Sequence, residues 1–236
     1  MTSCGQGGIK TYNKGLTLMD KGDYEKAIEA FSYGIELNDI AKSVNYYGRA
    51  YSHFELKNFN EAKSDIGKSL ETETLNKENI NSDIYWLKGM IAAAEGNKQL
   101  EIKSYEKAIE YAPENLWLKT TLGLALIENN ESKKAIEILT TVIEKNTQDA
   151  YAFNNRALAL IKVGKLEMAK SDLDESKKLD SQNPFLYKNY FLYYKEKNDL
   201  QNACQAIEEA LKKDMSEYGE ENDTKGLKKL KNEFCA

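Results

Sequence analysis

The chain has 236 residues, of which 41% are hydrophobic and 30% charged, and its formal net charge is −5. This composition is typical of a folded chain and excludes intrinsic disorder. The small negative charge argues against nucleic-acid binding, because proteins that bind nucleic acid concentrate Lys and Arg on one surface. No apolar stretch approaches the roughly 18 residues that a membrane-spanning helix needs.

Small residues recur at a nearly constant spacing along the chain, each followed twelve positions later by Ala in most cases. A period near 34 with a helical pattern predicts a stack of helix–turn–helix repeats, each burying its apolar face against the next. The anchor positions, with spacings of 35, 39, 34, 34 and 34 residues, are Gly15, Ala50, Gly89, Gly123, Ala157 and Phe191. The alanines are Ala27, Ala62, Ala135, Ala169 and Ala203.

The six anchor positions indicate six repeats. In each repeat we expect the small residues to lie where the two helices cross. A larger side chain should fill the space beside each crossing: Phe31, Ile66, Tyr105, Leu139, Leu173 and Ile207. The turns within the repeats contain residues that tolerate the left-handed conformation after a helix, namely Gly22, Asn58, Gly96, Asn130, Gly164 and Asn198.

Three departures from the pattern carry expectations of their own. Glu101 replaces the second-helix Ala of the third repeat, which predicts a looser or shifted crossing. Phe191 replaces the small residue of the sixth repeat, which predicts splayed helices. The extra residues around 76–81 predict either a longer inter-repeat loop or an additional helical turn, exposed and mobile in either case.

Several fragments carry a family resemblance. Residues 22–31 (GDYEKAIEAF), residues 105–113 (YEKAIEYAP) and Asn155-Arg156-Ala157 resemble segments of tetratricopeptide repeat proteins. The resemblance implies an all-α, right-handed superhelical solenoid with a concave groove lined by the first helix of each repeat. We expect a flexible leader at 1–8, a six-repeat solenoid at 9–217, and a loop followed by a capping helix at 218–236.

The first helices place many aromatic residues on the inner face that the resemblance implies. Aromatic anchors in a groove are typical of protein interfaces, although tight curvature would also let these residues pack on one another. Asn154 and Asn155 would hydrogen-bond a bound backbone or, alternatively, neighbouring helices. The predicted partner-binding residues are Tyr12, Tyr47, Tyr51, Phe54, Trp86, Trp117, Tyr151, Asn154, Asn155 and Phe185.

These patterns predict a non-catalytic interaction module, an adaptor or assembly scaffold that binds a protein or peptide. The alternative is a structural protein that self-assembles through its terminal repeats, but we expect a monomer. Co-chaperones of this family hold a carboxylate with Lys, Arg and Asn at fixed positions. Of the matching positions here only Asn155 fits, so a carboxylate-clamp co-chaperone is not expected.

Catalytic and metal chemistry find no support in the sequence. His53 is the single histidine, whereas a zinc site needs several converging ligands. The chain contains no nucleophile motif and no phosphate-binding glycine loop. We therefore predict no enzyme activity, no metal and no cofactor.

Near the C-terminus, Leu227, Leu230 and Phe234 are spaced as on one helix face, which predicts a helix capping the last repeat; a separate binding tail is the alternative. If this helix folds back, Cys204 and Cys235 would meet and form a disulfide in an oxidising compartment. Otherwise both are small packing residues.

The third cysteine, Cys4, stands in Thr2-Ser3-Cys4-Gly5, which resembles the cleavage region of a bacterial lipoprotein. The C-terminal pattern around Cys204 also resembles envelope lipoproteins with this repeat. The resemblance implies a lipid anchor at Cys4 and a location in the bacterial cell envelope. The apolar leader of such proteins is missing, so Met1 would be an added start; the alternative is an ordinary cytoplasmic protein.

Overall fold

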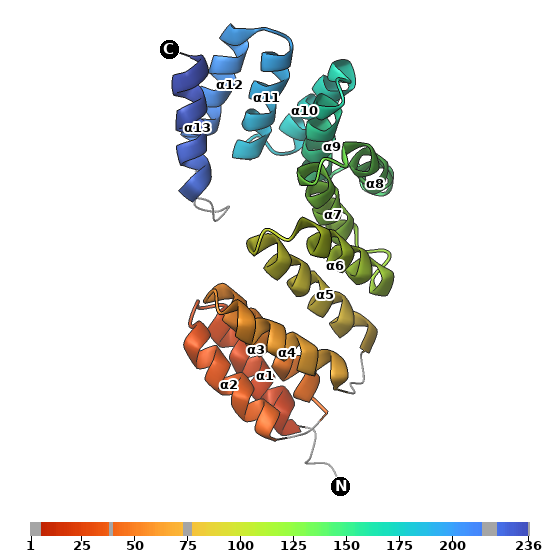
Figure 1. The fold of residues 1–236 in the computed structure, drawn as a ribbon, viewed down its shortest axis with the longest axis vertical. Coiled ribbons are helices and arrows are strands. Elements are labelled where there is room, and N and C mark those ends of the chain that lie inside the picture. Colours follow the sequence, from red (N-terminus) through yellow and green to blue (C-terminus); the bar gives the residue numbers. More distant parts are fainter. Residues whose placement is uncertain (1–5, 38–39, 73–76, 214–220, 236) are drawn as a thin grey trace. The chain divides into compact units, whose positions relative to one another are not determined.

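The computed structural model describes residues 6–37, 40–72, 77–213 and 221–235, and within these ranges every regular element is an α-helix. Consecutive helices run back and forth as antiparallel pairs (Figure 1), so the predicted all-α architecture is confirmed. The first helices are α1 (Gln6–Met19), α2 (Tyr24–Glu36), α3 (Lys42–Glu55), α4 (Phe59–Glu71), α5 (Lys77–Ala94), α6 (Lys98–Tyr111) and α7 (Leu116–Glu128). The remaining helices are α8 (Ser132–Lys145), α9 (Ala150–Lys162), α10 (Leu166–Leu179), α11 (Pro184–Glu196), α12 (Leu200–Lys212) and α13 (Glu221–Phe234).

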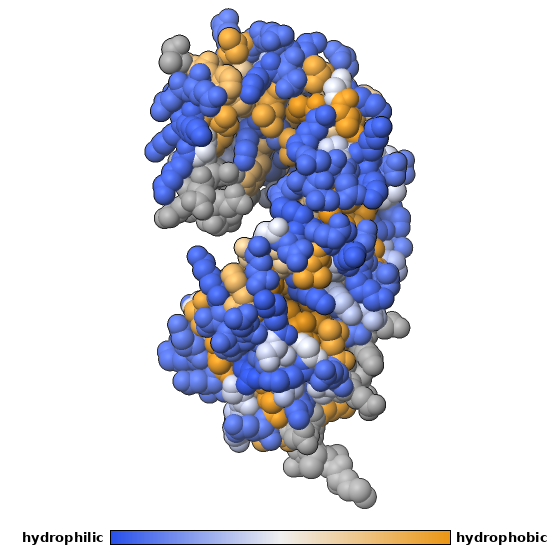
Figure 2. Space-filling view, in the orientation of Figure 1, coloured by the Kyte–Doolittle hydropathy of each residue, from blue (hydrophilic) through white to orange (hydrophobic). Residues whose placement is uncertain are grey.

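The chain divides into two compact units, residues 1–118 and 119–236. In the first unit the contacting pairs are α1 with α2, α3 with α4, and α5 with α6; in the second they include α9 with α10 and α11 with α12. Hydrophilic residues dominate the visible face, and hydrophobic residues show mainly between the helices (Figure 2). Within each unit, apolar residues are therefore buried between the paired helices and against neighbouring repeats.

Glycine at the helix crossings permits the close approach that the sequence predicts. A Cβ atom on Gly15 would lie 2.3 Å from the Phe31 ring, and one on Gly123 would lie 2.7 Å from Leu139. The alanines on the second helices, Ala27 among them, are fully buried. The small residues are thus confirmed as the contact points of the paired helices.

The third repeat does not have the looser crossing that Glu101 suggested. A Cβ atom on Gly89 would lie 2.3 Å from the Tyr105 ring, the same distance as at Gly15 in the first repeat. The approach is set by Gly89 and Tyr105. Glu101 is buried, with one carboxylate oxygen 3.3 Å from Lys98 Nζ one turn earlier on α6.

The insertion between the second and third repeats lengthens α5 by about one turn, which agrees with the second of the two alternatives. The prediction that this segment is exposed is wrong for Ile80 and Asn81, which are both buried. Helical geometry turns these side chains inward, and Ile80 joins the core formed by α3, α4 and α5. Residues 73–76 lie outside the described ranges.

The turns within the repeats contain one error of register. Lys57, not Asn58, adopts the left-handed conformation in the second repeat, with φ +61°. Lys57 lies seven residues after its anchor Ala50, as Gly22 and Asn130 do after theirs. Asn58 is the N-cap residue of α4. The position within the repeat, seven residues after the anchor, determines which residue is left-handed, and the residue type does not.

The predicted leader at 1–8 is also too long, because α1 begins at Gln6. The carbonyl oxygen of Gly8 accepts hydrogen bonds from Asn45 Nδ2 on α3 (3.1 Å) and from Thr11 Oγ1 (2.8 Å). These bonds hold the first turn of α1 in place. Residues 1–5, which include Cys4, lie outside the described ranges.

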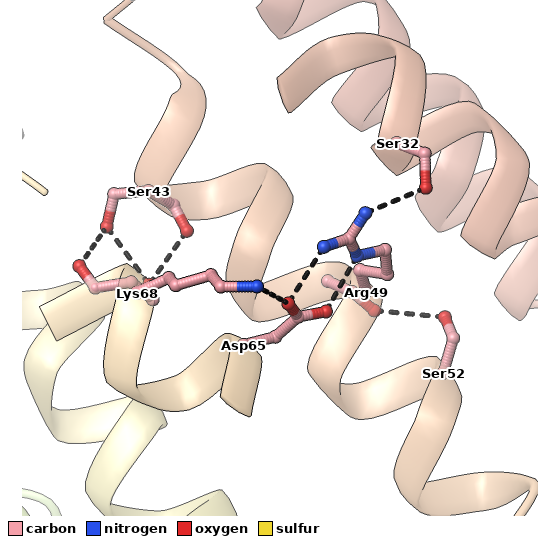
Figure 3. Close-up of polar contacts among 8 residues, drawn as sticks. Ser32, Ser43, Arg49, Ser52, Asp65 and Lys68 are labelled. Atoms are coloured by element: carbon pink, nitrogen blue, oxygen red, sulfur yellow. Dashed lines mark hydrogen bonds and ion pairs between the residues drawn. The ribbon is translucent and has the colours of Figure 1, made fainter. Parts of the chain in front are cut away.

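An Arg–Asp pair recurs in the second and fifth repeats and ties three helices together. Arg49 on α3 donates two hydrogen bonds to Asp65 on α4 (2.6 and 2.8 Å) and one to Ser32 on α2 (2.9 Å), as Figure 3 shows. Arg156 makes the same two bonds to Asp172, both 2.8 Å, and a third to another hydroxyl on α8. Both aspartates are buried, so each charge is compensated by a bidentate partner.

The last helix, α13, covers the end of the second unit, as the capping alternative predicts. Leu227 is only 2% exposed, and Leu230 and Phe234 pack against the core of α11 and α12. Phe191 is fully buried, and its ring lies 5.9 Å from that of Phe234. The large residue of the sixth repeat thus packs on the capping helix. A disulfide between Cys204 and Cys235 (S–S 2.09 Å) joins α12 to the end of α13.

Candidate functional site

Three aromatic rings from successive first helices form a row in the first unit. Tyr51 on α3 stacks on Trp86 of α5, with ring centroids 6.1 Å apart and an interplanar angle of 23°. Trp86 in turn meets Trp117, at the start of α7, edge to face at 5.3 Å and 62°. We call Tyr51, Trp86 and Trp117 the aromatic row.

The row is anchored on one side and open on the other. Tyr51 and Trp86 are half-buried and pack against the apolar core of α3, α4 and α5. Phe54 supports Tyr51 from the same helix, with ring centroids 6.3 Å apart. Trp117 is 55% exposed. The row therefore presents aromatic surface whose orientation is fixed by packing, a property of interface anchors.

Two tyrosines and a carboxylate lie beside the row. Tyr12 on α1 and Tyr47 on α3 are half-buried, and burial is the main cause that raises the pKa of each phenol. The negative charge of Asp83 on α5 raises both pKa values further, which places this carboxylate near both phenols. The pKa of Asp83 is itself raised, because its surroundings partly exclude water.

A second carboxylate borders the row at Glu55 on α3. Burial, the charge of Glu55 and a hydrogen bond to Glu55 together raise the pKa of Tyr51 to about 12, with burial as the largest cause. The pKa of Tyr24 on α2 is raised by burial and by the same carboxylate. The phenols of Tyr24 and Tyr51 thus remain neutral at physiological pH, and Glu55 supplies negative charge at the edge of the row.

The predicted partner-binding residues of the second unit have different environments. Tyr151 is 47% exposed, while Asn155 and Phe185 are half-buried. Asn154 is only 2% exposed, and its side-chain oxygen accepts a hydrogen bond from Asn189 Nδ2 at 3.0 Å. The alternative in which a neighbouring helix satisfies this amide therefore describes Asn154.

Sequence reasoning did not include Asp83 or Glu55 in the candidate site, although a signal was present. Asp83 lies six residues before its anchor Gly89, the position that Trp117 and Tyr151 occupy in the next two repeats. Glu55 lies four residues after Tyr51, on the same helix face. Acidic residues at positions equivalent to those of the aromatic residues are therefore part of the same face.

No other chemistry converges on the site. In the described ranges, no group of three or more His, Cys, Asp or Glu side chains could hold a metal ion. His53 is half-buried on α3, and burial lowers its pKa. None of the helices in those ranges is long and apolar enough to cross a membrane.

Comparison with protein families agrees with the paired helices. The tetratricopeptide repeat model matches residues 12–40 and 82–115, and a model described as the N-terminal TPR repeats region of Psidin matches residues 124–223. The chain is a tetratricopeptide repeat protein. Its helix pairs form about six repeats, and the two models match regions of both units.

Curated relatives share only part of their length with this tetratricopeptide repeat protein. BBSome complex member BBS4 of Bos taurus is 29% identical over 131 residues, which are 56% of this chain and 24% of the relative. RNA polymerase II-associated protein 3 of Xenopus laevis is 26% identical in an alignment of 197 positions that covers 75% of this chain and 28% of the relative. The chain thus spans about a quarter of the length of these relatives.

Solved structures show the same fold at low sequence identity. YrrB, described as a TPR protein with an unusual peptide-binding site, is 19% identical with a TM-score of 0.60, covering 75% of this chain and 89% of YrrB. PilW, a type IV pilus biogenesis factor, is 14% identical with a TM-score of 0.73. The match covers 93% of this chain and 97% of PilW. PilF of Pseudomonas aeruginosa is 14% identical with a TM-score of 0.71. The match covers 95% of this chain and 98% of PilF.

Proposed function

We propose that this tetratricopeptide repeat protein is a non-catalytic adaptor or assembly scaffold, and that the aromatic row of the first unit binds a peptide segment of another protein. The observation that carries the proposal is the exposure of Trp117, 55%, on a ring that Trp86 holds in place. An exposed aromatic ring with a fixed orientation loses little conformational entropy on binding.

Similar proteins support a binding role of this kind. YrrB is described as having a peptide-binding site, and BBS4 as a member of a complex. Both are interactions with other polypeptides. The specific partner of this chain does not follow from either likeness.

Self-assembly through the terminal repeats is the less favoured function. Stacking of copies would require an open apolar surface at the end of the array. At the C-terminal end α13 occupies that surface, with Leu227 buried against the last repeat. We therefore expect a monomer, and light scattering over a range of concentrations would test this.

The test of the proposed site is a selection followed by a binding measurement. A random 12-residue peptide library displayed on phage is panned against the whole protein, and a selected peptide is titrated while tryptophan emission is recorded. Both tryptophans of the chain lie in the row, so the emission reports on this site. We expect Trp117→Ala to weaken binding roughly 30-fold, as for an interface anchor worth about 2 kcal/mol.

Tyr33→Ala is the matched control for Trp117→Ala. Tyr33 is 58% exposed and lies in the same unit, but on a second helix. Its removal should leave the affinity unchanged when calorimetry measures it. Failure to select any peptide, or equal effects of the two substitutions, would contradict the proposed site.

We also propose that the protein works in an oxidising compartment, with the bacterial cell envelope as the predicted location. The Cys204–Cys235 disulfide supports this, because disulfides are rare in cytosolic proteins. Lipid attachment at Cys4 stays a prediction. Alkylation of the unreduced protein from its native cells, followed by mass spectrometry, should leave Cys204 and Cys235 unlabelled; labelling of both would favour the cytoplasm.

A further inference from the structure

We infer that the segment bound by the aromatic row carries a Lys or Arg side chain, and that this side chain lies against Asp83 and the rings of Trp86 and Tyr51. The inference rests on the proposed function and deepens it. It names the chemistry of the partner, which is a basic segment of another protein.

The repeat pattern places Asp83 in the binding face. Asp83 occupies the repeat position that holds Trp117 in the fourth repeat and Tyr151 in the fifth, and all three side chains are exposed. Asp83 also lies three residues before Trp86, so the two side chains are neighbours on the same face of α5. A ligand that contacts the Trp86 ring is therefore within reach of the Asp83 carboxylate.

Among the described residues, none supplies a compensating charge to the Asp83 carboxylate. Throughout the described ranges, no ion pair or hydrogen bond joins its side chain to another residue, whereas Asp65 and Asp172 each hold an Arg. The charge of Asp83 raises the pKa values of Tyr12 on α1 and Tyr47 on α3, and both of these side chains are neutral phenols. A negative charge in partly dehydrated surroundings is stabilised by a cationic ligand.

Several aromatic rings of the described residues have a Lys or Arg of this protein over one face, whereas the rings of Tyr51 and Trp86 do not. Tyr46 lies under Arg49 and Lys68, Tyr85 under Lys88, and Tyr111 under Lys107, at centroid distances between 5.5 and 5.8 Å. No such cation lies over Tyr51 or Trp86 in the part of the chain that the structure describes. These ring faces, bordered by Asp83 and Glu55, are suited to a cation supplied by a ligand.

The experiment extends the phage selection to three variants: Asp83→Asn, Asp83→Lys and the control Glu106→Gln. Glu106 is exposed on α6 in the same unit, a helix that contributes no ring to the row. The wild-type protein and Glu106→Gln should enrich peptides in which Lys or Arg adjoins apolar residues. Asp83→Asn should bind the selected wild-type peptide about two- to fivefold more weakly, as for the loss of one solvent-accessible ion pair.

Charge reversal makes the test independent of any general loss of affinity. Asp83→Lys should bind the selected peptide more weakly than Asp83→Asn does. It should bind more tightly to a variant of that peptide in which Glu replaces the basic residue. Added salt should weaken wild-type binding more than that of Asp83→Asn. Circular dichroism and melting curves establish that all variants fold alike.

Failure of the inference is distinct from failure of the proposed function. Enrichment of peptides without basic residues, or equal affinity of wild type and Asp83→Asn, would overturn the inference while Trp117→Ala still weakens binding. If Trp117→Ala has no effect either, the proposed site itself is wrong.

Discussion

Trp86 and Trp117 meet edge to face with centroids 5.3 Å apart, yet the two rings have different surroundings. Trp86 is half-buried and packs on the core of α3, α4 and α5, whereas Trp117 is mostly exposed. Edge-to-face pairs add to stability beyond the area that they bury. The row therefore combines a structural ring with a ring that is available to a ligand.

This difference predicts unequal costs for removing the two rings. Trp86→Ala should lower the free energy of unfolding by about 2 kcal/mol, because it leaves a cavity beside the core. Trp117→Ala should lower it by less than about 1 kcal/mol. Urea unfolding followed by far-ultraviolet circular dichroism measures both changes, and equal costs would contradict the assignment of separate roles.

Binding of a basic peptide should depend on pH through Asp83. The carboxylate must be ionised to attract a cation, so affinity should be full at pH 7 and fall as Asp83 becomes protonated. Because the pKa of Asp83 is raised from its ordinary value of 3.8, the loss should begin at a higher pH than for an unperturbed aspartate. Titrations between pH 7 and 4 measure it, and Asp83→Asn should show a weaker dependence.

The raised pKa of Asp83 means that its charge should favour binding of a cation but should not stabilise the fold. Ionisation of Asp83 is less favourable in the folded protein than in the unfolded chain, so its charge at pH 7 slightly favours unfolding. Asp83→Asn should therefore leave the melting temperature unchanged or raise it. The free energy of unfolding should change by no more than about 0.5 kcal/mol. A marked loss of stability would indicate a structural role instead.

Breaking one Arg–Asp pair should be costly, because Asp65 is buried. Arg49→Met removes the two hydrogen bonds to Asp65, the one to Ser32 and the guanidinium charge, and we expect a loss of about 3 kcal/mol. The double variant Arg49→Met, Asp65→Leu should recover much of that loss. A urea-unfolding mutant cycle measures the coupling, and additive effects would show that the pair acts as two independent residues. Arg156 and Asp172 in the second unit provide a repeat of the experiment.

Lys57 offers a site for stabilisation. Its φ of +61° is unfavourable for a residue with a Cβ atom, and its side chain is exposed. Lys57→Gly should raise the free energy of unfolding by about 0.5–1 kcal/mol, after the greater flexibility of Gly in the unfolded chain is taken into account. Asn130→Gly, at the equivalent turn, should gain less because Asn tolerates this conformation. The two melting temperatures test this order.

Reduction of the Cys204–Cys235 disulfide should loosen the capping helix. The bond closes a loop with a sequence separation of 31 residues, and the chain-entropy model assigns about 3–4 kcal/mol to a loop of this size. Dithiothreitol should lower the melting temperature and speed amide exchange in α13. The double variant Cys204→Ser, Cys235→Ser should start from the lower value and not respond to the reductant.

The periodic sequence by itself determined the helix pairs and their internal contacts. Gly15 with Phe31 and Gly123 with Leu139 meet because both pairs are separated by the same sixteen positions within one repeat. Such contacts follow from local helical geometry and a short turn, so the spacing alone predicts them. The single error among the turns, Asn58 for Lys57, arose where residue type was given more weight than spacing.

The side chains of the inner face that remain available to a ligand depend on how the repeats pack. Asn154 and Tyr151 lie three residues apart on α9, yet Asn154 is buried against Asn189 and Tyr151 stays exposed. Burial raises the pKa of Asp83 on α5, and the charge of Asp83 raises the pKa values of Tyr12 on α1 and Tyr47 on α3. Burial and charge at these positions depend on how neighbouring repeats pack, and that packing sums many weak contacts between side chains distant in sequence. The repeat spacing does not predict those contacts, so it predicts the helices but not the site.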